Sequence, residues 1–325
     1  MNKFLLCIFF LSLFCLETFA QQTVGLFSNT PESFDGYTLF APIPYTDTYL
    51  INNCGEKGHS WASTHGPALS VYLLEDGTLL RTGRIQGMGG DAFVEMIDWD
   101  GNVIWSYSPT ATHGRYHHDI ELLPNGNILM LVRDPKTQAE LDSVGGTTTR
   151  STINSEQVIE IQPDTVNGGA TVVWEWKAWD HLIQDVDTMK PNYGVVGQHP
   201  ERININAVSH ESGNWLYTNG IDYNENFDQI IISARTYNEF WIIDHSTTTS
   251  EAADSTSGKY GKGGDLLYRW GNPAAYDQGT SADRKLFLQH DAHWIPDSLN
   301  DAGKIILYNN QNRTSQEVQF GLEKL

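Results

Sequence analysis

The sequence predicts an all-β fold, and within that class a β-propeller, with six blades as the expected number. Short runs of β-favouring residues are closed by Asp-Gly or Asn-Gly, dipeptides that supply the positive φ angles of tight hairpins. Other runs end in tryptophan at recurring places, as expected for an aromatic wedge between packed blades. The ten Trp and fourteen Tyr residues fit strands rich in aromatic side chains. A pair of β-sandwiches is the alternative architecture.

Three hairpins and one short helix are expected in the first half of the chain. The hairpins cover residues 73–80, 96–105 and 122–129, and the helical segment lies around 135–144. Gly77 of the first hairpin and Gly126 of the third are 49 residues apart (126 − 77), close to the length of a four-stranded blade. The tryptophan-ended runs cover 103–105, 172–176 and 267–270.

Residues 1–20 predict a secretory signal peptide. Lys3 precedes the apolar run Phe4–Leu16, which is too short to span a membrane comfortably, and Thr18–Ala20 is typical of a cleavage site. An uncleaved anchor is the alternative. We expect one domain over residues 21–325, exported to the periplasm or secreted. The close of the chain at Leu325 predicts an incomplete last blade.

The composition limits the partners. The formal net charge of −20 repels nucleic acid and anionic membranes, so neither is expected to bind, and an anionic small substrate would need a local basic pocket. Cys7 and Cys15 leave with the signal peptide, so the remaining Cys54 predicts no intrachain disulfide. The sequence does not indicate an oligomeric state.

Two His-Asp pairs enter strand-like runs far apart in the chain: His118-Asp119 and His290-Asp291. Inner strands of different blades meet at the central channel of a propeller, so we expect both histidines at one channel mouth. Each aspartate either orients its neighbouring imidazole or bonds the loop backbone. A metal site at His113, His117 and His118 with Asp119 is the alternative, but the spacing does not match a known ligand pattern, so neither metal nor cofactor is predicted.

Seven segments occur in an order that resembles the bacterial arylsulfate sulfotransferases, the arylsulfotransferase family. They are His117–Ile120, Leu123–Asn127, Trp215–Asn224, Asp228–Arg235, Glu239–Ser246, Tyr268–Pro273 and Gln289–Ala292. The resemblance extends from about Gly36 to Asn309. It implies an exported six-bladed propeller that moves a sulfuryl group from a phenolic sulfate donor to a phenol acceptor, through a sulfated histidine and without a nucleotide.

The resemblance also implies the site residues. His290 would be the nucleophile, His118 a second catalytic imidazole and Arg235 the cation that binds the sulfuryl group. His117, Tyr217 and Asn219 would complete the substrate pocket. Neutral imidazole can attack sulfur and divide the transfer into two steps. A guanidinium offers paired donors to the sulfuryl oxygens.

Tyr217 departs from the family pattern, since related sequences usually carry histidine two residues before the position matched by Asn219. A tyrosine donates one hydrogen bond but is a poor general base at neutral pH. The alternative function is therefore a non-catalytic exported propeller that binds a small ligand or a protein.

Overall fold

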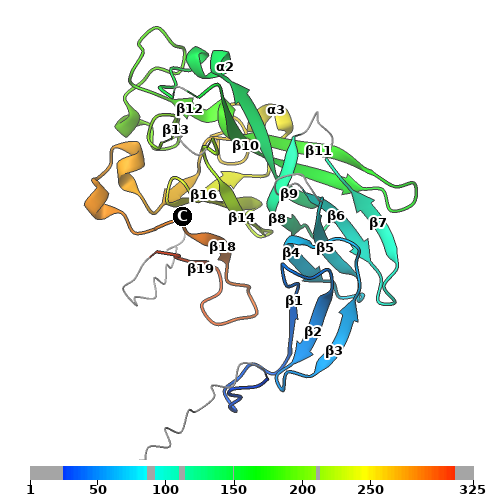
Figure 1. Ribbon diagram of the computed structural model, residues 1–325. Helices are drawn as coiled ribbons and strands as arrows, with labels where there is room; N and C mark the ends of the chain where they lie inside the picture. The colour runs from blue at the N-terminus through cyan, green and yellow to red at the C-terminus, as the bar shows by residue number, and fades with distance from the viewer. Residues whose placement is uncertain (1–24, 86–91, 110–113, 149, 210–212, 312–325) are drawn as a thin grey trace, which may run out of the picture. The chain divides into compact units, whose positions relative to one another are not determined.

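The computed structural model describes residues 25–85, 92–109, 114–148, 150–209 and 213–311 (Figure 1). The chain forms two compact units, the first over Met1–Phe40 and Tyr49–Ser60 and the second over Ala41–Thr48 and Trp61–Leu325. The first unit contains a three-stranded antiparallel sheet built from β1 (Tyr37–Phe40), β2 (Thr48–Asn52) and β3 (Lys57–Trp61). The predicted signal peptide lies outside the described residues.

Within the described residues, the second unit contains three four-stranded sheets, each made of strands consecutive in the chain and paired antiparallel (Figure 1). The first sheet holds β4 (Pro67–Leu73), β5 (Leu79–Arg84), β6 (Ala92–Ile97) and β7 (Val103–Tyr107). The second holds β8 (Arg115–Leu122), β9 (Ile128–Thr137), β10 (Thr152–Pro163) and β11 (Ala170–Lys177). The third holds β14 (Thr218–Asn224), β15 (Gln229–Ala234), β16 (Glu239–Asp244) and β17 (Tyr268–Trp270).

Two smaller pairings and a few helical turns complete the described part of this unit. β18 (His290–Trp294) pairs antiparallel with β19 (Ile305–Tyr308), and β12 (Leu182–Ile183) pairs parallel with β13 (Ile203–Asn204). The helices are α2 (Gln138–Ser143), α3 (Thr249–Ala252), η1 (Ala178–His181), η2 (Val196–Gln198), η3 (Pro273–Tyr276) and η4 (Ser281–Asp283). The all-β prediction is confirmed in part, since the chain is mostly β with short helical turns, and the six-bladed ring stays a prediction.

The hairpins form where the turn dipeptides predicted them. Gly77, Gly101 and Gly126 all have positive φ, between 84° and 91°, in the turns that join β4 to β5, β6 to β7 and β8 to β9. The helix expected around 135–144 is α2, which begins with a capping box between Thr137 and Glu140.

The recurring tryptophans lie on the fourth strand of each sheet: Trp105 on β7, Trp174 and Trp176 on β11, and Trp270 on β17. The indole nitrogens of Trp105 and Trp176 each donate a hydrogen bond of 2.7 Å, to the carbonyls of Gly169 and Gly264. Because each acceptor lies next to the following sheet in the chain, these rings join neighbouring sheets as the predicted wedges would.

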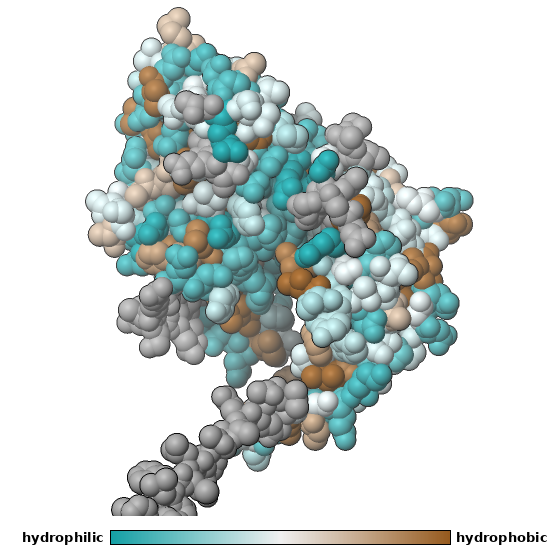
Figure 2. Space-filling model, in the orientation of Figure 1, coloured by the Kyte–Doolittle hydropathy of each residue, from teal (hydrophilic) through white to brown (hydrophobic). Residues whose placement is uncertain are grey.

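The core of the second unit lies between these sheets. Its largest buried cluster combines side chains of β9, β10 and β11 with those of β14, β15 and β16, including Leu131, Val158, Trp176, Ile232 and Trp241. The face shown in Figure 2 is mainly hydrophilic with scattered hydrophobic residues, in keeping with the charge of −20.

Candidate active site

The first strand of each four-stranded sheet, and β18 as well, is interrupted at a similar place by a break in register. The breaks fall between Pro67 and Val71, Tyr116 and Ile120, Thr218 and Ile221, and His290 and His293. A non-glycine residue with positive φ lies at or beside each break: Leu69 (102°), His118 (57°), Tyr217 (52°) and Asp291 (57°). Such bulges redirect side chains and are common next to active sites.

Asp119 joins three of these strands. Its Oδ1 accepts hydrogen bonds from the Ser70 hydroxyl on β4 (2.8 Å) and from its neighbour Ile120 N (3.0 Å), while Oδ2 accepts from the amide of Ile221 on β14 (3.1 Å). Of the two roles left open for Asp119, the structure therefore shows contact with the backbone and with a hydroxyl. The carboxylate fixes the strand that carries His118.

The structure brings together four of the side chains selected from the sequence. The rings of His118 and Tyr217 meet edge to face with centroids 5.0 Å apart. The Arg235 guanidinium, just after β15, lies 4.9 Å from the centroid of the Tyr217 ring. The charges of Arg235 and His290 both act on His118. Their roles in catalysis stay predictions, but their common location is a property of the structure.

Asn219 and Gly220 place β18 against β14. The Asn219 side chain is buried, and its amide donates to the carbonyl of Gln289, the residue before His290, at 2.8 Å. A Cβ at Gly220 would lie 3.1 Å from Cα and N of Asp291, so any side chain there would push the β18 backbone away by a few tenths of an ångström. Asn219 therefore positions the backbone that carries His290.

The His290 imidazole has one nitrogen held by the protein. Its Nδ1 lies 2.6 Å from the side-chain amide of Asn310, which leaves Nε2 for chemistry. Asp291, predicted either to orient His290 or to bond backbone, turns instead to His293, whose Nδ1 lies 3.4 Å from Oδ1 of Asp291. The His290 ring is thus held by Asn310, while Asp291 pairs with His293.

His117 contacts Glu156, a partner that the sequence did not reveal. Its Nε2 lies 2.6 Å from Oε2 of Glu156 on β10, and its Nδ1 lies 2.8 Å from Nδ1 of His118. Arg133 on β9 is a second residue that sequence reasoning missed, and its charge also acts on His118. The pairing of β9 with β10 places Arg133 opposite Glu156, a relation that the sequence alone does not show.

Burial controls the protonation of the site. Burial, assisted by the charges of His117, Arg133, His290 and Arg235, lowers the pKa of His118 to about 3. Burial likewise raises the pKa of Asp119 to about 6. His118 is therefore neutral at physiological pH, and two arginines supply the positive charge that an anionic substrate would need.

Glu121, two residues after Asp119, gives a stability prediction. Burial, assisted by Asp222 and Asp119, raises the pKa of Glu121 to about 9 from an ordinary value of 4.5. The folded state therefore holds a proton that the unfolded chain has lost, so stability falls by up to about 1.4 kcal/mol per pH unit as the pH rises from 4.5 towards 9. Glu121→Gln is expected to remove this fall and to be the more stable protein at pH 8.

Urea unfolding of both proteins at pH 5, 7 and 8 measures the effect, with Glu75→Gln, an exposed carboxylate in the β4–β5 turn, as control. The gain in the Glu121 variant should grow with pH, and the control should show no such trend. A constant difference between wild type and the Glu121 variant would contradict the buried, protonated carboxyl.

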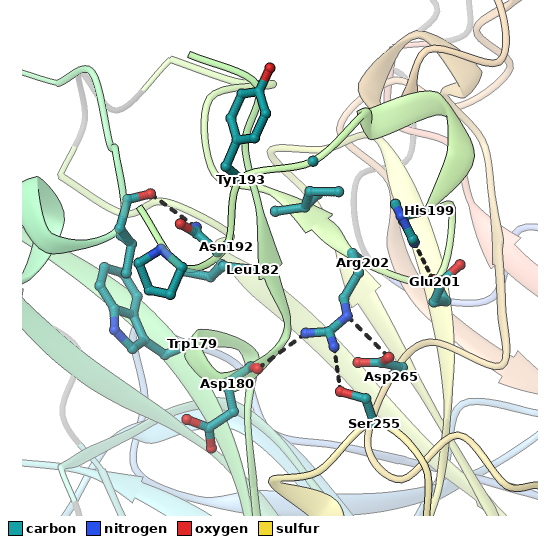
Figure 3. A pocket seen from close by; sticks show the side chains of 14 residues that line it. Trp179, Asp180, Leu182, Asn192, Tyr193, His199, Glu201, Arg202, Ser255 and Asp265 are labelled. Carbon is teal, nitrogen blue, oxygen red and sulfur yellow. Dashed lines mark hydrogen bonds and ion pairs between the residues drawn. The ribbon is translucent and has the colours of Figure 1, made fainter. Parts of the chain in front are cut away.

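A separate cavity of about 490 Å³ lies among residues 179–202, Ser255 and Asp265 (Figure 3). Its guanidinium, from Arg202, is already bound to Asp265 at 3.1 Å and to the hydroxyl of Ser255. None of the predicted site residues lines this cavity. It is therefore distinct from the place where His118, Tyr217 and Arg235 meet.

Metal binding finds no support in the described part of the chain, where no group of three or more His, Cys, Asp or Glu side chains is arranged around a common ion. His113, part of that alternative, lies outside the described residues. Within the same ranges, helices long and apolar enough to cross a membrane are not found.

Cys54 is an exposed free thiol.

Comparison with solved structures gives distant similarities. Hydrazine synthase of Kuenenia stuttgartiensis is 14% identical with a TM-score of 0.44, over 83% of this chain and 64% of that one. A streptogramin B lyase is 14% identical with a TM-score of 0.38, over 90% of this chain and 82% of the other. The β-propeller domain of Myceliophteria thermophila Cps50 (Swd1) is 10% identical with a TM-score of 0.38, over 85% and 77%. Curated protein sequences give no match.

The second unit is built from consecutive antiparallel sheets, and their first strands adjoin at a site with histidine and arginine side chains. The class of protein is therefore a mostly-β protein with a cationic site between sheets. The model of the Arylsulfotransferase (ASST) family matches residues 60–324, which include every residue of the candidate site. The chain belongs to the arylsulfotransferase family.

Proposed function

We propose that this protein transfers a sulfuryl group from a phenolic sulfate ester to a phenol, through a sulfated His290 and without a nucleotide donor. Family membership supports the reaction class. The observation that carries the proposal is the meeting of His118, Tyr217 and Arg235 beside the strand that begins with His290. We also infer an exported protein, and sheets that are the blades of a six-bladed propeller.

The chemistry assigns a role to each group. Nε2 of His290 attacks sulfur while the bond from sulfur to the aryl oxygen breaks, and the Asn310 amide oxygen accepts a hydrogen bond from the N–H at Nδ1, which keeps its proton. Arg235 holds two sulfuryl oxygens, with Arg133 adding charge nearby, which is typically worth a few kcal/mol in the transition state. A phenol then attacks the sulfated histidine and restores the free imidazole.

The wild-type protein tests this directly. Incubation with 4-nitrophenyl sulfate and phenol should release 4-nitrophenolate at a rate that depends on phenol, with parallel lines in double-reciprocal plots of donor at several phenol concentrations. Intact mass spectrometry after donor alone should show one added sulfuryl group. Release that does not depend on phenol would indicate a sulfatase, and no release would favour the alternative, a propeller that binds without catalysis.

Tyr217 favours the non-catalytic alternative, because it stands where related sequences have histidine. Variants at Tyr217 therefore test its role. Its ring lies between His118 and Arg235, which indicates that it serves as a platform. Tyr217→Phe keeps the ring and should retain transfer within about threefold, whereas Tyr217→Ala frees the guanidinium and should lose 10-fold or more, about the 1–2 kcal/mol of a partly buried cation–π contact.

Steady-state kinetics with 4-nitrophenyl sulfate compares the two variants. Equal losses in both would show that the hydroxyl, rather than the ring, is what the reaction uses. Circular dichroism of each variant controls for folding, because Tyr217 adopts positive φ in the strand break.

A further inference from the structure

A buried carboxylate and two imidazoles form a continuous chain that leads to the candidate site. Glu156 and His117 have side chains that are only 4% and 3% exposed, and their contact of 2.6 Å is an ion pair or a charged hydrogen bond. His117 then meets His118 through the two Nδ1 atoms, 2.8 Å apart, with the rings nearly perpendicular at 89°. The proposed reaction uses neither Glu156 nor His117.

The contacts limit where protons can reside. An ionised carboxylate only accepts, so Nε2 of His117 carries a proton. Between the two Nδ1 atoms there is one proton, on His117 or on His118. If His117 holds it, His117 is an imidazolium and neutral His118 has a proton on Nε2. If His118 holds it, both rings are neutral and Nε2 of His118 has a free lone pair.

We propose that Glu156 and His117 form a proton store that supplies and recovers the proton of His118 in sulfuryl transfer. This inference rests on the proposed function. When the bond from sulfur to the aryl oxygen breaks, the electron pair goes to oxygen, His118 gives it the Nε2 proton, and Nδ1 of His118 takes the proton of His117. When the acceptor phenol attacks the sulfated His290, its proton goes to Nε2 of His118 and the Nδ1 proton returns to His117. The cycle is balanced in protons.

Glu156 and His117 compensate for the low basicity of His118. Burial lowers its pKa to about 3, so this ring alone would be a weak base that could not keep a proton taken from phenol. Passing the charge to His117 places it beside the Glu156 carboxylate, where an opposite charge stabilises it. His117 and Glu156 act through His118 and are positioning residues, not groups that touch the substrate.

Glu160 provides a matched control. It lies four residues further along the same strand, is 6% exposed, and also contacts a histidine, with Oε2 3.0 Å from Nε2 of His245. His245 also contacts Asp228 and follows β16. Glu160→Gln therefore changes a buried carboxylate–histidine contact without altering the chain that ends at His118.

The test uses a series of aryl sulfates whose leaving phenolates differ in basicity, with a fixed phenol acceptor. Glu156→Gln should lower kcat/KM for phenyl sulfate by about 100-fold, because a basic leaving group needs the proton, and for 4-nitrophenyl sulfate by only a few-fold. Glu160→Gln should affect both donors equally. An equal loss on both donors in the Glu156 variant would mean a structural role and would overturn the proposal.

A measurement that needs no turnover keeps this inference separate from the proposed function. Nitrogen-15 shifts of the labelled histidines should show Nε2 of His117 protonated, and the His117–His118 pair sharing one proton between Nδ1 atoms. Glu156→Gln should change the shifts of both rings, and Glu160→Gln those of His245 instead. If the wild-type protein shows these shifts but no sulfuryl transfer, the proposed function alone is rejected. If the shifts of His117 and His118 are unchanged by Glu156→Gln, the proton store is rejected.

Discussion

His290→Asn is expected to abolish phenol-dependent sulfuryl transfer, with a loss on the order of 10⁴-fold or more. Asparagine fills part of the imidazole volume and can keep a hydrogen bond to Asn310, but it offers no nucleophilic lone pair. The sulfuryl adduct seen with donor alone should vanish in this variant. Intact mass spectrometry together with release of 4-nitrophenolate measures both effects.

His293→Asn is the matched control, because His293 is on the same strand and its side chain is 41% exposed, with Asp291 as its partner. It should form the adduct at nearly the wild-type rate. An adduct that persists in His290→Asn would locate the nucleophile elsewhere, and peptide mapping would then show whether it is His118. Loss of transfer in both variants, with folding intact, would mean that the strand and not the His290 ring is what matters.

The local turns and the alternation of strands could be predicted from the sequence because their causes are local. Asp76-Gly77 and Asn125-Gly126 fix their hairpins through positive φ at glycine, and tryptophan recurs in β-favouring runs that the structure places on fourth strands. His118 and His290 could be proposed as neighbours because repeats of one unit carry equivalent residues to the same place, whereas Arg235 was added to them by the motif resemblance. Their motif resemblance supplied the roles that spacing alone did not.

Glu156 could not be found in this way, since nothing in its own neighbourhood distinguishes it from Glu160. Its importance depends on pairing between β9 and β10 and on the break in β8, which turns His118 through positive φ and leaves His117 facing inward. The partner of Asp291 was similarly undetermined, because a carboxylate beside two histidines can reach either and the break in β18 decides between them. Bulges are set by tertiary packing and leave little trace in a single sequence.

Arg269→Met is expected to reduce the free energy of unfolding by about 3–5 kcal/mol, the cost of leaving a buried charge without its partner. Arg269 donates to Oε2 of Glu239 through Nη2 (2.6 Å) and Nε (3.0 Å), and Glu239 is fully buried. The loss should extend to the site, because the carbonyl of Glu239 accepts from Gln289 at 2.6 Å, next to His290. Urea unfolding and the rate of adduct formation measure the two effects.

The pH dependence separates an unpaired charge from a simple loss of packing. Burial already raises the pKa of Glu239, and Arg269 opposes that rise, so removing Arg269 raises it further. A raised folded-state pKa gives stability that is present at low pH and lost as pH rises, so the penalty of Arg269→Met should be larger at pH 8 than at pH 5. Adding Glu239→Gln to the Arg269→Met variant should recover part of the lost stability, since the neutral amide needs no counter-charge.

Lys177→Met, which removes a partly exposed pair with Glu175, should cost about 1 kcal/mol or less at both pH values. A penalty for Arg269→Met that stays the same from pH 5 to pH 8 would assign its role to the packing of the guanidinium against Tyr276, 4.2 Å from the ring centroid, and not to its charge.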